Sequence, residues 1–283
     1  MNPPIDQMQW LTRDGVVLKY RELGTGATPI VLVHGWACDH TFLLPQLDHL
    51  SRAHRVLAVD LCGHGQSGTP DRRYTPAEFA ADIQWLCTEL HWPPAIIIGH
   101  SMGGNVALEM AAIHPGSVSA ICLIDSVVFP SEPLITYLEG LFSRLDGPEY
   151  QQALMEIAGS LFLETDDPAR KAELLQRMSR TPQHVAVAAF RGHLFDYDCT
   201  AAVEACKVPM AYLSAAHPLA DLARLRSHCP QLMTGQTIGS GHFSPVEVPE
   251  QINSMLDRFV KLATSAAGGI DFIKNRLPSA IAH

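Results

Sequence analysis

The chain contains no apolar run that approaches the roughly 18 to 20 residues needed to cross a bilayer. Its first seven residues show neither a basic n-region nor an apolar h-region, so we expect no secretory signal. Basic residues are outnumbered by acidic ones: the formal net charge is -9, and no basic cluster occurs. These absences argue against nucleic acid or an anionic membrane as a partner. We expect a soluble, cytoplasmic protein.

The sequence also lacks the spacings that hold metals and disulfides. Seven cysteines are scattered, odd in number and never spaced as C-x-x-C, so we expect reduced and mostly buried thiols. Fourteen histidines are present, yet they form no H-E-x-x-H or comparable group of ligands. We therefore expect neither a metal nor another cofactor.

The order of apolar segments predicts an α/β fold with a mostly parallel sheet. Of the 283 residues 47% are hydrophobic, enough for one α/β domain with an insertion. A hairpin over 8–12 and 16–22 is followed by short β-branched or apolar runs that alternate with helical patterns. Such alternation is typical of parallel strands with helices on both faces. The expected strands are 29–35, 55–60, 96–98, 118–125, 208–213 and 233–238, and the expected helices between and after them are 41–50, 76–90, 220–228 and 249–262.

One segment interrupts this alternation. Between residues 127 and 199 only helical periods occur, for example over 150–163, 168–180 and 183–194. We interpret 127–199 as a helical cap inserted into a core formed by 1–126 and 200–265. The remaining 266–283 form a C-terminal tail, which we expect to be disordered.

A serine between glycines stands where the run 96–98 stops. Gly99-His100-Ser101-Met102-Gly103 is followed by a stretch rich in helix formers, so a strand, a sharp turn and a helix meet at Ser101. Glycines at such a turn avoid collisions with the neighbouring strand and helix. This pattern resembles the nucleophile elbow of the α/β-hydrolase superfamily, and the resemblance extends over nearly the whole chain. It implies the α/β-hydrolase fold, with Ser101 as the nucleophile.

His242 is the best candidate for the base that activates this serine. It lies in the glycine-flanked loop Gly239-Ser240-Gly241-His242, after the last expected strand. That loop is at the carboxyl edge of the sheet, as Ser101 is, and sites of open α/β sheets form there. The segment from Gly239 to Glu250 is also similar to the one that carries the catalytic histidine in α/β-hydrolases.

The third member of a triad is less clear. Where most of the family has an aspartate after the penultimate strand, this chain has His217. Some members take the acid from the end of the strand after the elbow helix, and that position holds Asp125. Either carboxylate could accept the Nδ1 proton of His242 and fix its tautomer. We favour Asp125, with Asp221 as the alternative and an unidentified acid left open.

The resemblance also implies an oxyanion hole made of two backbone N–H groups. One is expected from Met102, directly after the nucleophile, and the other from Trp36, in the loop after His34-Gly35. The Trp36 indole either contacts the substrate or packs beneath the cap. We assign a structural role to Asp60 and the glycine loop 63–67.

Together these residues predict a serine hydrolase that cleaves a carboxylic ester or lactone through an acyl-enzyme. Amides and carbon–carbon bonds next to a ketone stay open. The cap is rich in apolar side chains, so a small-molecule substrate with an apolar moiety is expected.

A second interpretation belongs to another class. The Gly35-Trp36 pair and the displaced Asp125 are similar to the cofactor-free dioxygenases that open 3-hydroxy-4-oxoquinoline rings. Those enzymes have histidines where this chain has Cys38 and Met102. We therefore favour the hydrolase. A third interpretation, an inactive fold that serves as a receptor or scaffold, is weaker because serine, histidine and a candidate acid are all present.

Overall fold

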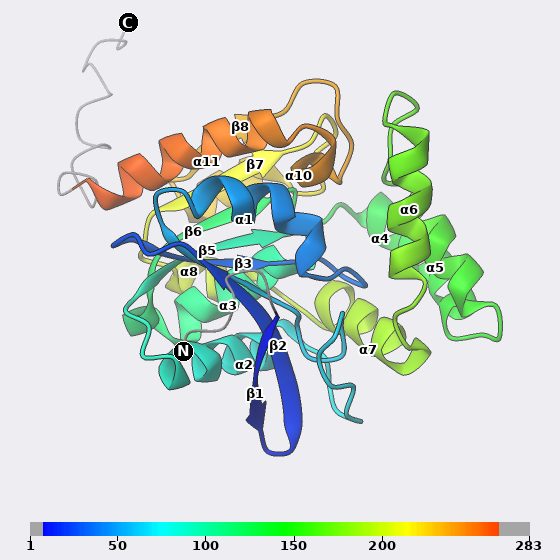
Figure 1. The fold of residues 1–283 in the computed structure, drawn as a ribbon. Helices are drawn as coiled ribbons and strands as arrows, with labels where there is room; N and C mark the ends of the chain where they lie inside the picture. The colour runs from blue at the N-terminus through cyan, green and yellow to red at the C-terminus, as the bar shows by residue number, and fades with distance from the viewer. Residues whose placement is uncertain (1–7, 266–283) are drawn as a thin grey trace, which may run out of the picture.

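The structure, a computed structural model, describes residues 8–265 (Figure 1). The expected tail, 266–283, lies outside the described residues. A single sheet of eight strands has the order β1-β2-β4-β3-β5-β6-β7-β8. β1 and β2 pair antiparallel and β2 pairs antiparallel with β4, whereas all later neighbours are parallel. The strands are β1 (Gln9–Arg13), β2 (Val16–Leu23), β3 (Pro29–Val33), β4 (Arg55–Val59), β5 (Ala95–His100), β6 (Val118–Ile124), β7 (Met210–Ser214) and β8 (Met233–Gln236).

Helices cover both faces of this sheet, and a separate group of them forms the cap (Figure 1). The α-helices are α1 (Leu44–Leu50), α2 (Pro76–Glu89), α3 (Met102–Ile113), α4 (Glu132–Leu145), α5 (Tyr150–Gly159), α6 (Pro168–Met178), α7 (Gln183–Leu194), α8 (Thr200–Ala205), α9 (Leu222–His228), α10 (Ser244–Glu247) and α11 (Pro249–Thr264). Two short 3-10 helices are η1 (His40–Leu43) and η2 (Pro115–Ser117). No helix within residues 8–265 has the length and apolar character that a bilayer crossing requires.

Alternating side chains of the central strands supply two separate cores. Ile30 and Leu32 of β3 face α1 and α11, whereas Val31 and Val33 belong to the cluster that includes α2, α3 and the cap. Since successive side chains of a strand point to opposite faces, a strand buried on both sides must be apolar throughout. All of β3 is buried. This is why β3, and β5 as far as Ile98, are continuous apolar runs in the sequence.

The cap consists of α4, α5, α6 and α7, and Figure 1 shows these helices at one end of the sheet. The expected helix over 150–163 is shorter and ends at Gly159. Beyond that end the chain turns, and the Leu161 carbonyl accepts a hydrogen bond from the N–H of His242 at 3.0 Å. The helix expected over 41–50 begins as η1, with Asp39 as its N-terminal cap. Sequence analysis did not anticipate the short helices α8 and α10.

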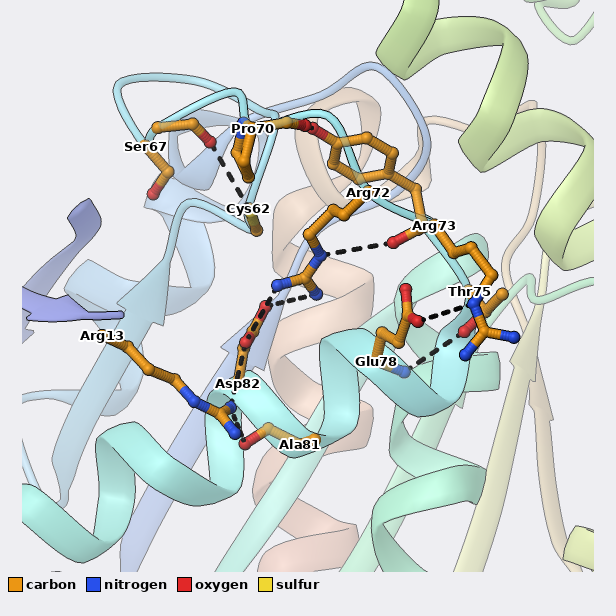
Figure 2. Close-up of polar contacts among 12 residues, drawn as sticks. Arg13, Cys62, Ser67, Pro70, Arg72, Arg73, Thr75, Glu78, Ala81 and Asp82 are labelled. Atoms are coloured by element: carbon orange, nitrogen blue, oxygen red, sulfur yellow. Dashed lines mark hydrogen bonds and ion pairs between the residues drawn. The ribbon is translucent and has the colours of Figure 1, made fainter. Parts of the chain in front are cut away.

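A buried carboxylate on α2 pairs with an arginine of the N-terminal hairpin. Asp82 of α2 is 4% exposed and pairs with two arginines (Figure 2). Its Oδ1 lies 3.1 Å from Nη1 of Arg13, and its Oδ2 lies 2.8 Å from Nη2 of Arg72. A carboxylate this buried requires such partners, because an unpaired charge inside a protein is strongly destabilising. The contact fixes the hairpin and the loop before α2 against one helix.

Two glycines provide a matched test of the close packing of α3 against β3. A Cβ on Gly103 would lie 2.2 Å from the backbone oxygen of Val33, whereas a Cβ on Gly140 of α4 would meet nothing within 4 Å. We expect Gly103→Ala to lower the free energy of unfolding by about 2 kcal/mol or more, because α3 must move away from β3. Gly140→Ala is expected to raise it by about 0.5 to 1 kcal/mol. Urea unfolding of both variants measures this, and equal effects would contradict the packing described.

Candidate active site

Ser101 lies in the turn between β5 and α3, in a backbone conformation that is rare for any residue except glycine. Its φ is 55° and its ψ is -123°, and its N–H still donates to the Ile124 carbonyl at 2.9 Å. The turn is tight enough that a Cβ on Gly99 would lie 2.0 Å from the Gly103 oxygen. Strained backbone of this kind persists only where the surroundings hold it. The sequence thus places the Ser101 side chain at the carboxyl edge of the sheet.

The imidazole of His242 meets the carboxylate of Asp125 at that same edge. Nδ1 of His242 lies 2.8 Å from Oδ2 of Asp125, and the two side chains are 5% and 1% exposed. Asp125 follows β6 directly with a φ of 42°. Its second oxygen accepts from the N–H of Ala215 at 3.1 Å, and its own N–H donates to Leu213 at 2.8 Å. One carboxylate oxygen is therefore held by His242 and the other by the chain directly after β7.

The alternative acid has a different position. Asp221 is exposed and caps the N-terminus of α9, where its carboxylate accepts from the N–H of Arg224 at 2.9 Å. His217, which stands where most of the family has the acid, is exposed as well. Of the two candidate carboxylates, Asp125 contacts His242, whereas Asp221 caps a helix.

Neighbouring groups hold the His242 loop in place. The His242 N–H donates to Leu161 of the cap, and the His242 carbonyl accepts from Nε2 of His100 at 2.9 Å. The rings of His100 and His242 have centroids 4.6 Å apart. Burial, and then the proximity of His242, hold the pKa of His100 well below its ordinary value. His100 is therefore a neutral donor that orients the loop.

The loop after β3 passes directly beside the serine. A Cβ on Gly35 would lie 3.0 Å from the Cβ of Ser101, so a side chain here would push its neighbours apart by a few tenths of an ångström. His34 fixes the loop, since its Nδ1 donates to the Gly35 carbonyl at 2.8 Å and its Nε2 accepts from Leu61 N–H at 3.0 Å. Trp36 comes next, and Met102 is the first residue of α3, where backbone N–H groups have no intrahelical acceptor.

The Trp36 indole packs against the cap. Its Nε1 donates to the Ala186 carbonyl of α7 at 2.8 Å, and its ring packs edge-on against Phe190 with centroids 4.9 Å apart. Of the two roles considered from the sequence, packing beneath the cap describes this side chain. The indole still forms part of a cavity wall, but its N–H is engaged.

Ser101 and His242 line one cavity of about 50 Å³. Apolar side chains of the cap form about half of the other walls, namely Leu134, Leu138, Ile157, Leu161, Met178, Phe190 and Leu194. Pockets for drug-sized ligands measure roughly 300 to 1,000 Å³. With the cap in this position, the cavity holds only a small apolar group next to the serine.

Polar contacts also join the cap to the core. Thr181 donates to the carbonyl of Ala37 at 3.3 Å, and Arg177 pairs with Asp39 at 3.0 Å. Both core residues lie in the loop after Gly35, so the position of the cap and the shape of that loop are linked.

Asp39, His40 and Asp60 present ligand atoms within 4.8 Å of one another, as a metal site does. These atoms are already engaged within the protein. One Asp60 oxygen accepts from the N–H and Nδ1 of His40, both at 2.8 Å, and the other accepts from Gln66 N–H. Burial acts to raise the Asp60 pKa, but the bonds from His40 outweigh it and lower the pKa. This arrangement fits a structural role for Asp60.

Sequence analysis did not single out His193, which lines the same cavity. It is 5% exposed and lies near the C-terminal end of α7. The available signal was its spacing: Ala186, Ala189, Phe190 and His193 recur at the interval of one helix face, and all four are buried. Which cavity that face meets depends on how the cap docks, and this is not encoded in helix periodicity.

Comparison with known proteins finds relatives that match part of the chain in sequence. A curated relative, the dihydrolipoyllysine-residue acetyltransferase component of an acetoin cleaving system from Cupriavidus necator, is 35% identical over 135 residues. These residues are 48% of this chain but only 36% of that protein, so the chain spans about a third of that relative's length.

Solved structures share the fold over most of the chain. A thermophilic esterase from Thermogutta terrifontis superposes with a TM-score of 0.81 at 23% identity, covering 92% of this chain and 100% of that one. The enol-lactonase from Burkholderia xenovorans LB400 superposes with a TM-score of 0.79 at 23% identity, covering 89% of this chain and 100% of that one. At these identities the likeness shows the fold.

The sequence model of one family, described as the alpha/beta hydrolase fold, matches residues 28–184. That match includes β3, the turn at Ser101 and Asp125, and it spans more than half of the 283 residues. The eight-stranded sheet and the serine at the strand-to-helix turn have the form expected of this family. The chain therefore belongs to the alpha/beta hydrolase fold family.

Proposed function

We propose that this protein is a serine hydrolase that cleaves a carboxylic ester or lactone with an apolar moiety through an acyl-enzyme. The observation that carries the proposal is the 2.8 Å contact between His242 Nδ1 and Asp125 Oδ2, with His242 and Ser101 on one cavity. A carboxylate oxygen only accepts, so Nδ1 bears the proton and Nε2 has the free lone pair. The neutral imidazole is thus in the tautomer that can deprotonate a serine.

In this mechanism the Ser101 hydroxyl attacks the substrate carbonyl while His242 Nε2 takes its proton. The tetrahedral intermediate collapses, the leaving alcohol receives that proton, and the acyl group stays on Ser101. Water then attacks the acyl-enzyme with His242 again as the base, releasing the acid and restoring the serine. Asp125 keeps the imidazole oriented and stabilises its charged form in both halves of the cycle.

The backbone N–H groups of Trp36 and Met102 are the proposed oxyanion hole. Support comes from the close approach of Gly35 to Ser101 and from the position of Met102 at the start of α3. There the helix dipole also favours a developing negative charge. Each such donor contributes roughly 2.7 to 4 kcal/mol to transition-state stabilisation in comparable enzymes.

Two further observations support hydrolysis over ring-opening dioxygenation. Cys38 lines the cavity and Met102 is fully buried, and neither side chain can replace the histidines of the similar dioxygenases as a base near neutral pH. The names of the structural neighbours, an esterase and an enol-lactonase, point to the same substrate class. Oxygen-dependent consumption of a 3-hydroxy-4-quinolone, without any ester hydrolysis, would favour the dioxygenase instead.

Turnover of p-nitrophenyl acetate and butyrate tests the proposal and the choice of acid together. We expect Asp125→Asn to lower kcat by about 10²- to 10⁴-fold, since the imidazole loses its orienting acceptor. The matched control Asp221→Asn should change kcat by less than about twofold, because an asparagine also caps a helix well. Equal losses in the two variants would contradict the assignment of Asp125, and an inactive wild type would contradict the function.

The small cavity generates a prediction about acyl length. We expect kcat/KM to fall by about tenfold or more from p-nitrophenyl acetate to the octanoate, because the longer chain must displace the cap. Leu138→Ala removes three carbons from the cavity wall. We expect this variant to reduce the acetate-to-octanoate ratio of kcat/KM by about tenfold, and to lower the free energy of unfolding by about 2 to 5 kcal/mol. Val185→Ala serves as a control, since Val185 is buried in the cap without belonging to this cavity wall. A preference for long chains in the wild type would contradict a closed cap.

A further inference from the structure

His193 has a position that the proposed catalytic cycle does not use. Its side chain is almost fully buried and lines the cavity shared by Ser101 and His242. The end of α7 that carries it is anchored to the core, since the His193 carbonyl accepts from Nδ2 of Asn105 at 3.3 Å. The ring itself packs edge-on against Phe190, with centroids 6.0 Å apart. The orientation of this imidazole is therefore fixed by its surroundings.

The hydrogen bond of the ring determines which of its nitrogens is a donor. Nδ1 lies 2.6 Å from the Ala189 carbonyl, and a carbonyl only accepts, so Nδ1 carries the proton. Burial, opposed in part by that bond, lowers the pKa of His193 to about 4, so near neutral pH the ring is uncharged. Nε2 then has a lone pair and no proton. Among residues 8–265 the one hydrogen bond of this ring is made by Nδ1, and Nε2 has no partner.

Ser101 and Nε2 of His242 are used by the proposed catalytic cycle, and the unpartnered Nδ1 of His100 is enclosed by protein atoms. The other polar side-chain groups on this cavity are engaged. Nδ1 of His242 bonds to Asp125, Nε2 of His100 donates to a backbone carbonyl, and the Trp36 indole donates to Ala186. The Cys38 thiol donates to the Trp36 carbonyl at 3.3 Å. Within this mostly apolar wall, Nε2 of His193 is thus an acceptor available to a bound molecule. An acceptor left unpaired on binding costs free energy, so such a site discriminates against ligands without a donor.

We propose that His193 Nε2 accepts a hydrogen bond from a hydroxyl or amide N–H on the acyl group of the substrate. This inference rests on the proposed hydrolase function and narrows it: the preferred substrates are esters or lactones whose acyl part carries a hydrogen-bond donor within an otherwise apolar frame. His193 contributes to specificity through contact with the substrate, and the chemistry stays with Ser101 and His242.

Matched pairs of methyl esters, followed by pH-stat titration, test this proposal. Methyl 3-hydroxybutanoate is compared with methyl 3-methylbutanoate, where a methyl replaces the hydroxyl. Methyl N-acetylglycinate is compared with methyl 4-oxopentanoate, where a CH₂ replaces the N–H. The readout is the kcat/KM ratio within each pair, for the wild type relative to His193→Phe. Differences in intrinsic reactivity between the two esters cancel in that comparison.

We expect His193→Phe to reduce the donor preference by about fivefold to tenfold in at least one pair, the size typical of one neutral hydrogen bond. The rate on the ester without a donor is the reference within each pair, so a general loss of activity in the variant leaves the ratio unchanged. Leu194→Val, which alters the adjacent wall and leaves the imidazole intact, should keep the wild-type ratio. His193→Gln retains an acceptor oxygen and should recover part of the preference. If the Phe variant does not fold, His193→Leu, which also lacks a polar atom, takes its place.

Two outcomes overturn the proposal and are distinguishable. If the wild type hydrolyses the esters but His193→Phe leaves both ratios unchanged, the acceptor role is wrong while the hydrolase function stands. If the wild type hydrolyses none of the four esters and no p-nitrophenyl ester, the proposed function fails and this inference fails with it.

Discussion

The contact between the His242 imidazole and the Asp125 carboxylate is the interaction on which the rest of the site depends. It joins two segments more than a hundred residues apart, and it exists because β6 ends at Ile124 beside β5 and β7. Asp125 takes up a left-handed backbone conformation directly after that strand, as Ser101 does after β5. The parallel sheet thus brings a serine, a carboxylate and a histidine loop to one edge, where open α/β sheets generally form their sites.

The cap contributes both cavity walls and hydrogen bonds to the site at the sheet edge. It supplies apolar walls above Ser101, it accepts the N–H of His242 through Leu161, and it accepts the indole N–H of Trp36 through Ala186. Excluding water from such a cavity strengthens every electrostatic interaction inside it. The contacts that shape the cavity are therefore also the contacts that hold the catalytic loops, so motion of the cap affects substrate entry and loop geometry together.

Much of this arrangement was predictable from local sequence. A β-branched run, flanking glycines and a following stretch of helix-forming residues predict the turn at Ser101. The residues of its turn predict the N-terminal hairpin. Asp125 could be chosen over Asp221 only by analogy, since the pairing depends on which strand ends beside the histidine loop. His193 escaped attention because helix periodicity shows that a face is buried, and only the docking of α7 onto the core determines what that face meets.

The central claim is that Ser101 is a nucleophile activated by His242, and intact-mass spectrometry after treatment with a p-nitrophenyl alkylphosphonate tests it most directly. The account predicts one covalent adduct per chain, located on Ser101, absent in Ser101→Ala and formed far more slowly in His242→Ala. A wild-type protein that gains no mass, or an adduct that persists in Ser101→Ala, would contradict it.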